Sequence, residues 1–270
     1  MRISVVGVIA GVLLSGLITS ATFDATDATP DFSGFWQHGA RGQQYRNPAS
    51  GPGPIRRVGV PEDASFTANW FGDDRNPILQ PWTAEAVRIQ RERESKGLAD
   101  ASAFTTCRPM GVPFILTYVR PIQFLQTPDR VYIVYQYDHQ SRIVYLNRPH
   151  SKDLKPSYYG ESVGHYEGDT LVVDTIGMND KTWTDRFGTP HTDQLHVVER
   201  YSVTNSDGGK RLNVLFTVSD PGAFTSEWSA VVRFWRTEPE DQLTPSGTML
   251  EEVCAENNSG PIPTADKPDF

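Results

Sequence analysis

Residues 158–201 read YYGESVGHYEGDTLVVDTIGMNDKTWTDRFGTPHTDQLHVVERY. Apolar runs such as residues 171–173 are separated there by turn residues such as those at 167–169. Short β-branched runs joined by glycine and aspartate predict β-hairpins. The same stretch holds three of the six histidines of the chain and many carboxylates. Because a segment that only fills a core does not need so many titratable groups, the stretch predicts a site as well as strands.

The strand pattern extends in both directions from this stretch, between residues 121 and 237. There is no alternation of strands with helices, so the pattern predicts a mainly β fold, a single antiparallel barrel-like or sandwich domain. Three hairpins are predicted, at residues 131–135 with 142–146, 162–166 with 170–175, and 194–204 with 211–218, followed by a strand at 227–236.

The flanking segments have a different composition. Residues 22–120 are rich in proline, glycine, aspartate and asparagine but also contain many aromatic residues, which predicts an irregular wrap and not disorder. One short helix is expected at residues 83–96, ended by Gly97. Residues 238–270 are expected to form a tail, and residues 22–270 a single domain.

The amino terminus has the pattern of a secretory signal. Arg2 precedes an apolar run at residues 3–18 and small residues at 19–21, which predicts a signal peptide over residues 1–21, with an uncleaved anchor as the alternative. The mature protein is then expected to be periplasmic or secreted, and not in a membrane. In an oxidising compartment, Cys107 and Cys254 are expected to form a disulfide.

The charge of the chain bears on its partners. There are 25 Lys and Arg residues against 33 Asp and Glu residues, a formal net charge of −8. Nucleic-acid binding needs clustered basic residues, so nucleic acid is not expected as a partner. A small-molecule ligand or substrate is expected instead, and the oligomeric state is not predicted.

Two motifs in the central stretch suggest specific chemistry. Residues 160–164, GESVG, match the pattern of a hydrolase nucleophile elbow, but a strand follows where the elbow requires a helix, so the glycines are expected to serve strand packing. His191, Asp193, His196 and Glu199 form the densest group of metal-ligand types. On a strand, however, His196 and Glu199 face opposite sides. No metal or cofactor is therefore predicted, and a divalent metal is kept as the alternative.

General acid–base chemistry needs only a histidine and a carboxylate. The candidate catalytic residues are His191, Asp193, His196 and, on a neighbouring hairpin, His165. The candidate substrate-binding residues are Arg200, Arg142, Asp174 and Tyr135. Asp174 is expected to pair with Arg142 or Arg200, because an unpaired buried carboxylate is costly.

The predicted function is that of an exported enzyme, a lyase, isomerase or hydrolase, acting on a small organic substrate. The first alternative is a non-catalytic protein that binds a small molecule. A second alternative is an envelope interaction domain without a pocket.

Several blocks of the sequence support two resemblances. DFSGFW at residues 31–36 resembles the Gly-x-Trp start of lipocalin-like barrels, in which the tryptophan closes one end. PIQFLQTPDR at 121–130, SVGHYEGDTLVVDT at 162–175 and PHTDQLHVVERY at 190–201 resemble a family of exported bacterial proteins of unknown function. These resemblances imply a barrel that forms one unit, and they imply no mechanism.

Overall fold

A computed structural model describes residues 29–38, 45–58, 71–98, 102–103, 105–206, 208–237 and 249–254. The signal peptide expected at residues 1–21 lies outside these ranges, as does most of the expected tail. In the described ranges, no helix is long and apolar enough to cross a membrane.

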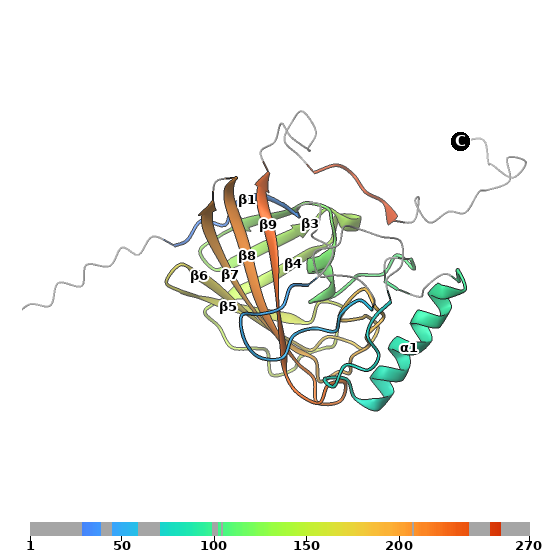
Figure 1. The fold of residues 1–270 in the computed structure, drawn as a ribbon. Helices are drawn as coiled ribbons and strands as arrows, with labels where there is room; N and C mark the ends of the chain where they lie inside the picture. The colour runs from blue at the N-terminus through green and yellow to red at the C-terminus, as the bar shows by residue number, and fades with distance from the viewer. Residues whose placement is uncertain are drawn as a thin grey trace, which may run out of the picture.

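The described part of the chain forms a closed barrel of nine strands (Figure 1). Each strand pairs with the next along the chain, and the last pairs with the first. The predicted barrel-like β domain is therefore confirmed. The strands are β1 (Gly34–His38), β2 (Ile122–Gln126), β3 (Arg130–Tyr135), β4 (Ser141–Leu146), β5 (Glu161–Glu167), β6 (Thr170–Ile176), β7 (His196–Ser206), β8 (Gly209–Ser219) and β9 (Trp228–Thr237).

The three predicted hairpins are present as β3–β4, β5–β6 and β7–β8. Their side chains alternate between the two faces of the barrel wall. In β7, for example, Val197, Glu199 and Tyr201 are fully buried, whereas His196 and Arg200 are partly exposed. Because successive residues of a strand point to opposite faces, the buried set fills the barrel and forms its core.

One strand pair differs from the predicted antiparallel arrangement. Strands β4 and β5 run parallel, with Val144 opposite Ser162 and Leu146 opposite Gly164. A parallel pair cannot be joined by a tight turn, because the chain must return to the end where the first strand began. Residues 147–160 make this return, and they include Pro149 and Pro156.

The barrel is closed by a strand from the segment expected to be irregular. Strand β1 lies between β2 and β9. Its Trp36 is fully buried, and the indole N–H donates to the carbonyl of Phe32 at 2.8 Å. The Arg236 guanidinium carbon of β9 lies 5.3 Å from the centre of the Trp36 ring. The strand that contains the Gly-x-Trp segment thus pairs with both β2 and β9 and closes the barrel.

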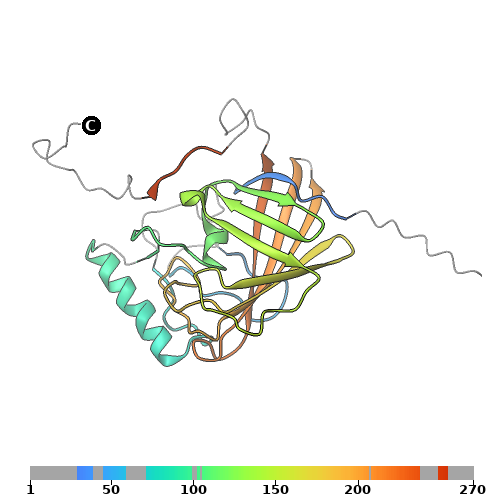
Figure 2. The same cartoon turned by 180° about the vertical axis from the view of Figure 1, so that it is seen from behind.

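Helix α1 (Pro81–Ser95) corresponds to the predicted helix and begins two residues earlier, at a proline suited to the first helical turn. Two short 3₁₀ helices, η1 (Phe114–Thr117) and η2 (Tyr137–His139), accompany it. Figures 1 and 2 show α1 beside the barrel, near the β8–β9 connection. The Thr83 hydroxyl donates to the Ala223 carbonyl of that connection at 2.8 Å.

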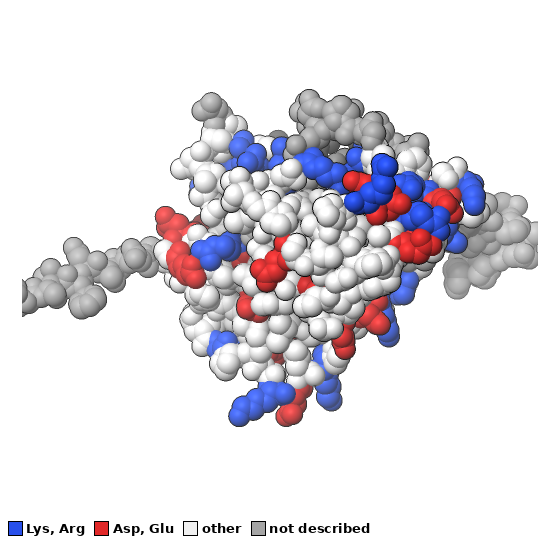
Figure 3. Space-filling model, turned by 60° about the horizontal axis from the view of Figure 1, so that its bottom comes forward, with Lys and Arg blue, Asp and Glu red and all other residues white. Residues whose placement is uncertain are grey.

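On the face shown in Figure 3, acidic and basic side chains are interspersed.

The expected disulfide is present. Cys107 and Cys254 are bonded, with their Cα atoms 5.4 Å apart, and so tie the carboxyl-terminal segment to the residues before β2. Glu252 strengthens this attachment, because it accepts from the Tyr118 hydroxyl and lies 3.2 Å from the Arg120 guanidinium.

Candidate functional site

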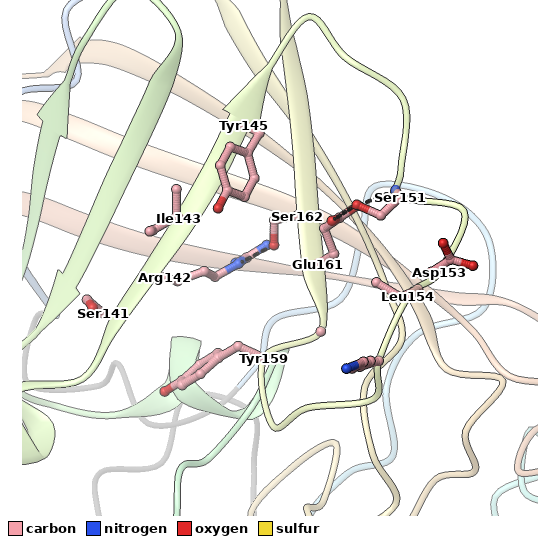
Figure 4. Close-up of a pocket in the computed structure, with 12 residues that line it drawn as sticks. Ser141, Arg142, Ile143, Tyr145, Ser151, Asp153, Leu154, Tyr159, Glu161 and Ser162 are labelled. Atoms are coloured by element: carbon pink, nitrogen blue, oxygen red, sulfur yellow. Dashed lines mark hydrogen bonds between the residues drawn. The ribbon is translucent and has the colours of Figure 1, made fainter.

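A pocket opens in the barrel wall where β4 and β5 separate. The two strands pair at only three positions, and a cavity of about 460 Å³ lies next to this short pairing. Figure 4 shows its lining, which comes from both strands and from the 147–160 connection. The lining residues are Ser141, Arg142, Ile143, Tyr145, Ser151, Asp153, Leu154, Lys155, Tyr159, Gly160, Glu161 and Ser162.

One lining residue, Arg142, forms a buried ion pair with Glu199, which lies outside the pocket lining. Their side chains are 1% and 0% exposed. One guanidinium nitrogen, Nη1, donates to Glu199 Oε1 at 3.0 Å, and Nη2 donates to the other carboxylate oxygen. Burial opposes the charge on Arg142, but the adjacent Glu199 outweighs it and holds the pKa of the guanidinium above its ordinary value.

Three hydroxyl groups complete this buried network. Ser162 accepts from Arg142 Nε at 2.8 Å, and Thr175 accepts from Nη2 at 2.7 Å. The Tyr201 hydroxyl donates to Glu199 at 2.6 Å. These residues come from four strands, β4 to β7, and each of them points into the barrel because of strand alternation. A buried pair is tolerable only when its remaining hydrogen-bonding groups are satisfied in this way.

The outer side of the pocket is organised by Glu161. Its carboxylate accepts from the backbone N–H of Ser151 at 2.7 Å and from the Ser151 hydroxyl at 2.5 Å (Figure 4). Partial burial opposes ionisation, but the hydrogen bonds from Ser151 outweigh it, so the pKa of Glu161 lies below its ordinary value. Glu161 thus fastens the 147–160 connection to β5.

Two histidines share a carboxylate next to Glu161, on the outer face of the barrel. His150 Nδ1 lies 3.3 Å from Glu161, and its Nε2 lies 3.0 Å from Asp174 Oδ1. His196 Nε2 lies 3.0 Å from the same oxygen. The hydrogen bond with Asp174 raises the pKa of His196, and the hydrogen bond with His196 lowers the pKa of Asp174.

Asp174 therefore has different partners from those expected. Asp174 is opposite Val198 in the β6–β7 pair, so its diagonal neighbour on the outer face is His196. Arg142 points into the barrel instead, toward Glu199. Arg200 is on the outer face but pairs with Glu167 at 2.6 Å, and His165 lies 3.0 Å from that same carboxylate.

The expected catalytic group is not brought together. His191 is 3% exposed, and its Nδ1–H donates to the Thr192 carbonyl at 2.9 Å. Its Nε2 accepts from the Thr182 hydroxyl at 2.8 Å, and burial lowers the pKa of His191 below its ordinary value. Asp193 is exposed on the loop that precedes β7. His196 and His165 belong to the two separate outer-face clusters described above.

Of the residues expected at the site, Arg142 lines the pocket, and Tyr135 lies beside it, because its ring stacks on that of Tyr159. Reasoning from the sequence missed Ser151, Glu161 and Tyr159. One signal could have indicated them, because the long proline-containing connection at residues 147–160 is the kind of segment that carries function. In the described ranges, no group of three or more His, Cys, Asp or Glu residues could hold a metal ion.

Comparisons of the sequence with protein-family models and with curated proteins found no match. The resemblance to a family of exported proteins thus stays a prediction.

Proposed function

We propose that this protein binds a small polar organic molecule in the pocket between β4 and β5. The observation that carries the proposal is the pocket itself, a cavity of about 460 Å³, which is within the usual size range for small-ligand sites. Its lining combines apolar groups with a few placed polar groups. Tyr145, Tyr159 and Leu154 provide apolar surface, and Ser151, Lys155 and Glu161 provide donors, acceptors and both signs of charge.

A fragment screen by ¹H–¹⁵N NMR tests this proposal. Ligands that occupy the pocket should shift the amide signals of Ser151, Lys155 and Glu161. Ser141→Phe should weaken these ligands, because it places a ring at an exposed lining position. Asn205→Phe, at the exposed end of β7, is the matched control and should leave binding unchanged. Fragments that bind but do not shift the pocket residues, or no binding at all, would contradict the proposal.

Acid–base catalysis at the pocket rim is the second candidate. It is favoured by the position of His150, which contacts the pocket residue Glu161 and shares Asp174 with His196. A histidine oriented by a carboxylate can take up and release a proton near neutral pH. Glu161 would orient the bound molecule, and His150 would transfer a proton to or from that molecule.

The catalytic proposal is tested with compounds that bind. Each is incubated with the protein and followed by mass spectrometry for a change in structure. His150→Gln should leave binding intact and abolish conversion. Compounds that are bound and released unaltered by the unsubstituted protein would leave only the binding role.

Export is proposed on two observations. The amino-terminal residues have the pattern of a signal peptide, and Cys107 is bonded to Cys254, as is usual outside the reducing cytoplasm. The mass of the protein recovered from the periplasmic fraction of a bacterial host should correspond to a chain that starts after Ala21. An unprocessed chain in the membrane fraction would point to the anchor alternative.

A further inference from the structure

Two buried donor groups lie beside the pocket without an acceptor in the described part of the chain. They are the hydroxyl of Tyr135 and the side-chain nitrogen Nε2 of Gln140. Tyr135 is 1% exposed and Gln140 Nε2 is itself buried. Leaving such groups unsatisfied is costly, so buried groups of this kind usually have a partner.

Both groups adjoin the same residue of the pocket lining, Tyr159. The Tyr159 ring stacks on that of Tyr135, with an interplanar angle of 5° and ring centres 6.0 Å apart. The Tyr159 hydroxyl donates to Gln140 Oε1 at 2.5 Å. The backbones are also joined, because the Tyr135 N–H donates to the Gln140 carbonyl at 2.8 Å. Tyr159 therefore lines the pocket and contacts both Tyr135 and Gln140.

The hydrogen-bonding properties of these two groups indicate the kind of ligand that would fit them. The amide nitrogen of Gln140 can only donate. The Tyr135 hydroxyl lies close enough to Arg142 for the guanidinium to act on its pKa, but burial raises this pKa to about 12, so the hydroxyl keeps its proton. Arg142 can only donate, so this proton still needs an acceptor. The charge of Arg142 is matched by Glu199, so the surroundings do not call for an anion.

We propose that the inner end of the pocket receives an acceptor oxygen of a neutral carbonyl compound, to which Tyr135 and Gln140 donate when the Tyr159 ring turns aside. This inference rests on the proposed binding function and specifies its ligand class. The ring of Tyr159 would pack against the ligand, and its hydroxyl would leave Gln140 Oε1.

Acetophenone and 1-phenylethylamine test the inference, because they share a skeleton and differ in carrying an acceptor or a cationic donor. Dissociation constants come from NMR titration of the amides of Tyr159 and Lys155. Tyr135→Phe and Gln140→Glu should each weaken acetophenone by about fivefold, the equivalent of one neutral hydrogen bond. Neither change should weaken the amine. Tyr132→Phe, on the outer face of β3, removes a hydroxyl as the matched control and should leave both constants unchanged.

Unfolding measurements show whether a variant that binds weakly is still folded. Tyr135→Phe keeps the ring and leaves the hydrogen bonds between Arg142 and Glu199 in place, so the variant should keep a cooperative unfolding transition. Acetophenone that binds in the pocket with the same affinity to Tyr135→Phe and Gln140→Glu would overturn this inference and leave the proposed binding function intact. So would a pocket that binds the amine and not acetophenone. A pocket that binds neither probe nor any other fragment would overturn both.

Discussion

Removing the charge of Arg142 should destabilise the barrel by about 3 kcal/mol. Breaking a buried, hydrogen-bonded ion pair typically costs about 3–5 kcal/mol, because the remaining charge is left unpaired. Arg142→Met removes both guanidinium hydrogen bonds to Glu199, but the Tyr201 hydroxyl still donates to that carboxylate. The loss is therefore expected toward the lower end of the range.

The double variant Arg142→Met/Glu199→Gln should recover most of this loss. It removes both charges, and the amide introduced by E199Q can still accept from Tyr201. The hydroxyls of Ser162 and Thr175 lie 3.0 Å apart and can bond each other. Replacing a buried pair by neutral groups is often close to neutral, so the double variant should lie within about 1 kcal/mol of the unsubstituted protein.

Urea unfolding followed by tryptophan fluorescence measures these free energies. Arg200→Met is the matched control, since Arg200 pairs with Glu167 on the exposed outer face and its loss should barely move the midpoint. A loss below about 1 kcal/mol for Arg142→Met, or a double variant as unstable as the two single variants added together, would refute the reasoning.

Three further predictions concern titration and the disulfide. Burial raises the pKa of Asp185 from 3.8 to about 6, so the stability gained by protonation is complete below 3.8 and is lost as the pH rises through about 6. Asp185→Asn should therefore be more stable than the unsubstituted protein at pH 7, by up to about 3 kcal/mol in urea unfolding, and similar to it near pH 4. Asp174→Asn should lower the pKa of His196 in an NMR titration, because it removes the carboxylate that raises it. Cys254→Ser should lower the free energy of unfolding by at most about 5 kcal/mol, given the separation of 147 residues from Cys107, and reductant should lower the melting temperature of the unsubstituted protein to that of the variant.

The hairpins could be predicted because the residues that specify each one are neighbours in the sequence. Residues 162–175 combine two β-branched runs with a glycine turn, and the structure pairs them as β5 and β6. The disulfide could be predicted from the expected compartment and the presence of only two cysteines. Strand β1 could not, because its partners β2 and β9 are distant in sequence and its five residues lie in a segment rich in turn formers.

The site was predicted less well, because the sequence alone does not reveal which polar residues are buried together. Alternation correctly separates His196 from Glu199, but the predicted site lies on the face of β7 that carries His196 and not on the face that carries Glu199. Charged residues are rarely buried unless they are paired, and the charged partner of Glu199 comes from another strand. Tyr201 is two residues away on β7, but only the strand order brings Arg142 of β4 to Glu199.

The GESVG motif shows how the parallel strand pair and the pocket depend on each other. A side chain at Gly164 would lie 2.9 Å from the Val172 carbonyl, and Gly160 has a φ of +62°, so both positions require glycine. The glycines therefore serve close packing of β5, as predicted, and they bracket Ser162. Its hydroxyl contacts Arg142 and Thr175, neither of which is a general base, so it serves the buried network and not nucleophilic attack. The register that places Ser162 there also leaves the first three residues of β4 without a partner on β5, and these three residues line the pocket.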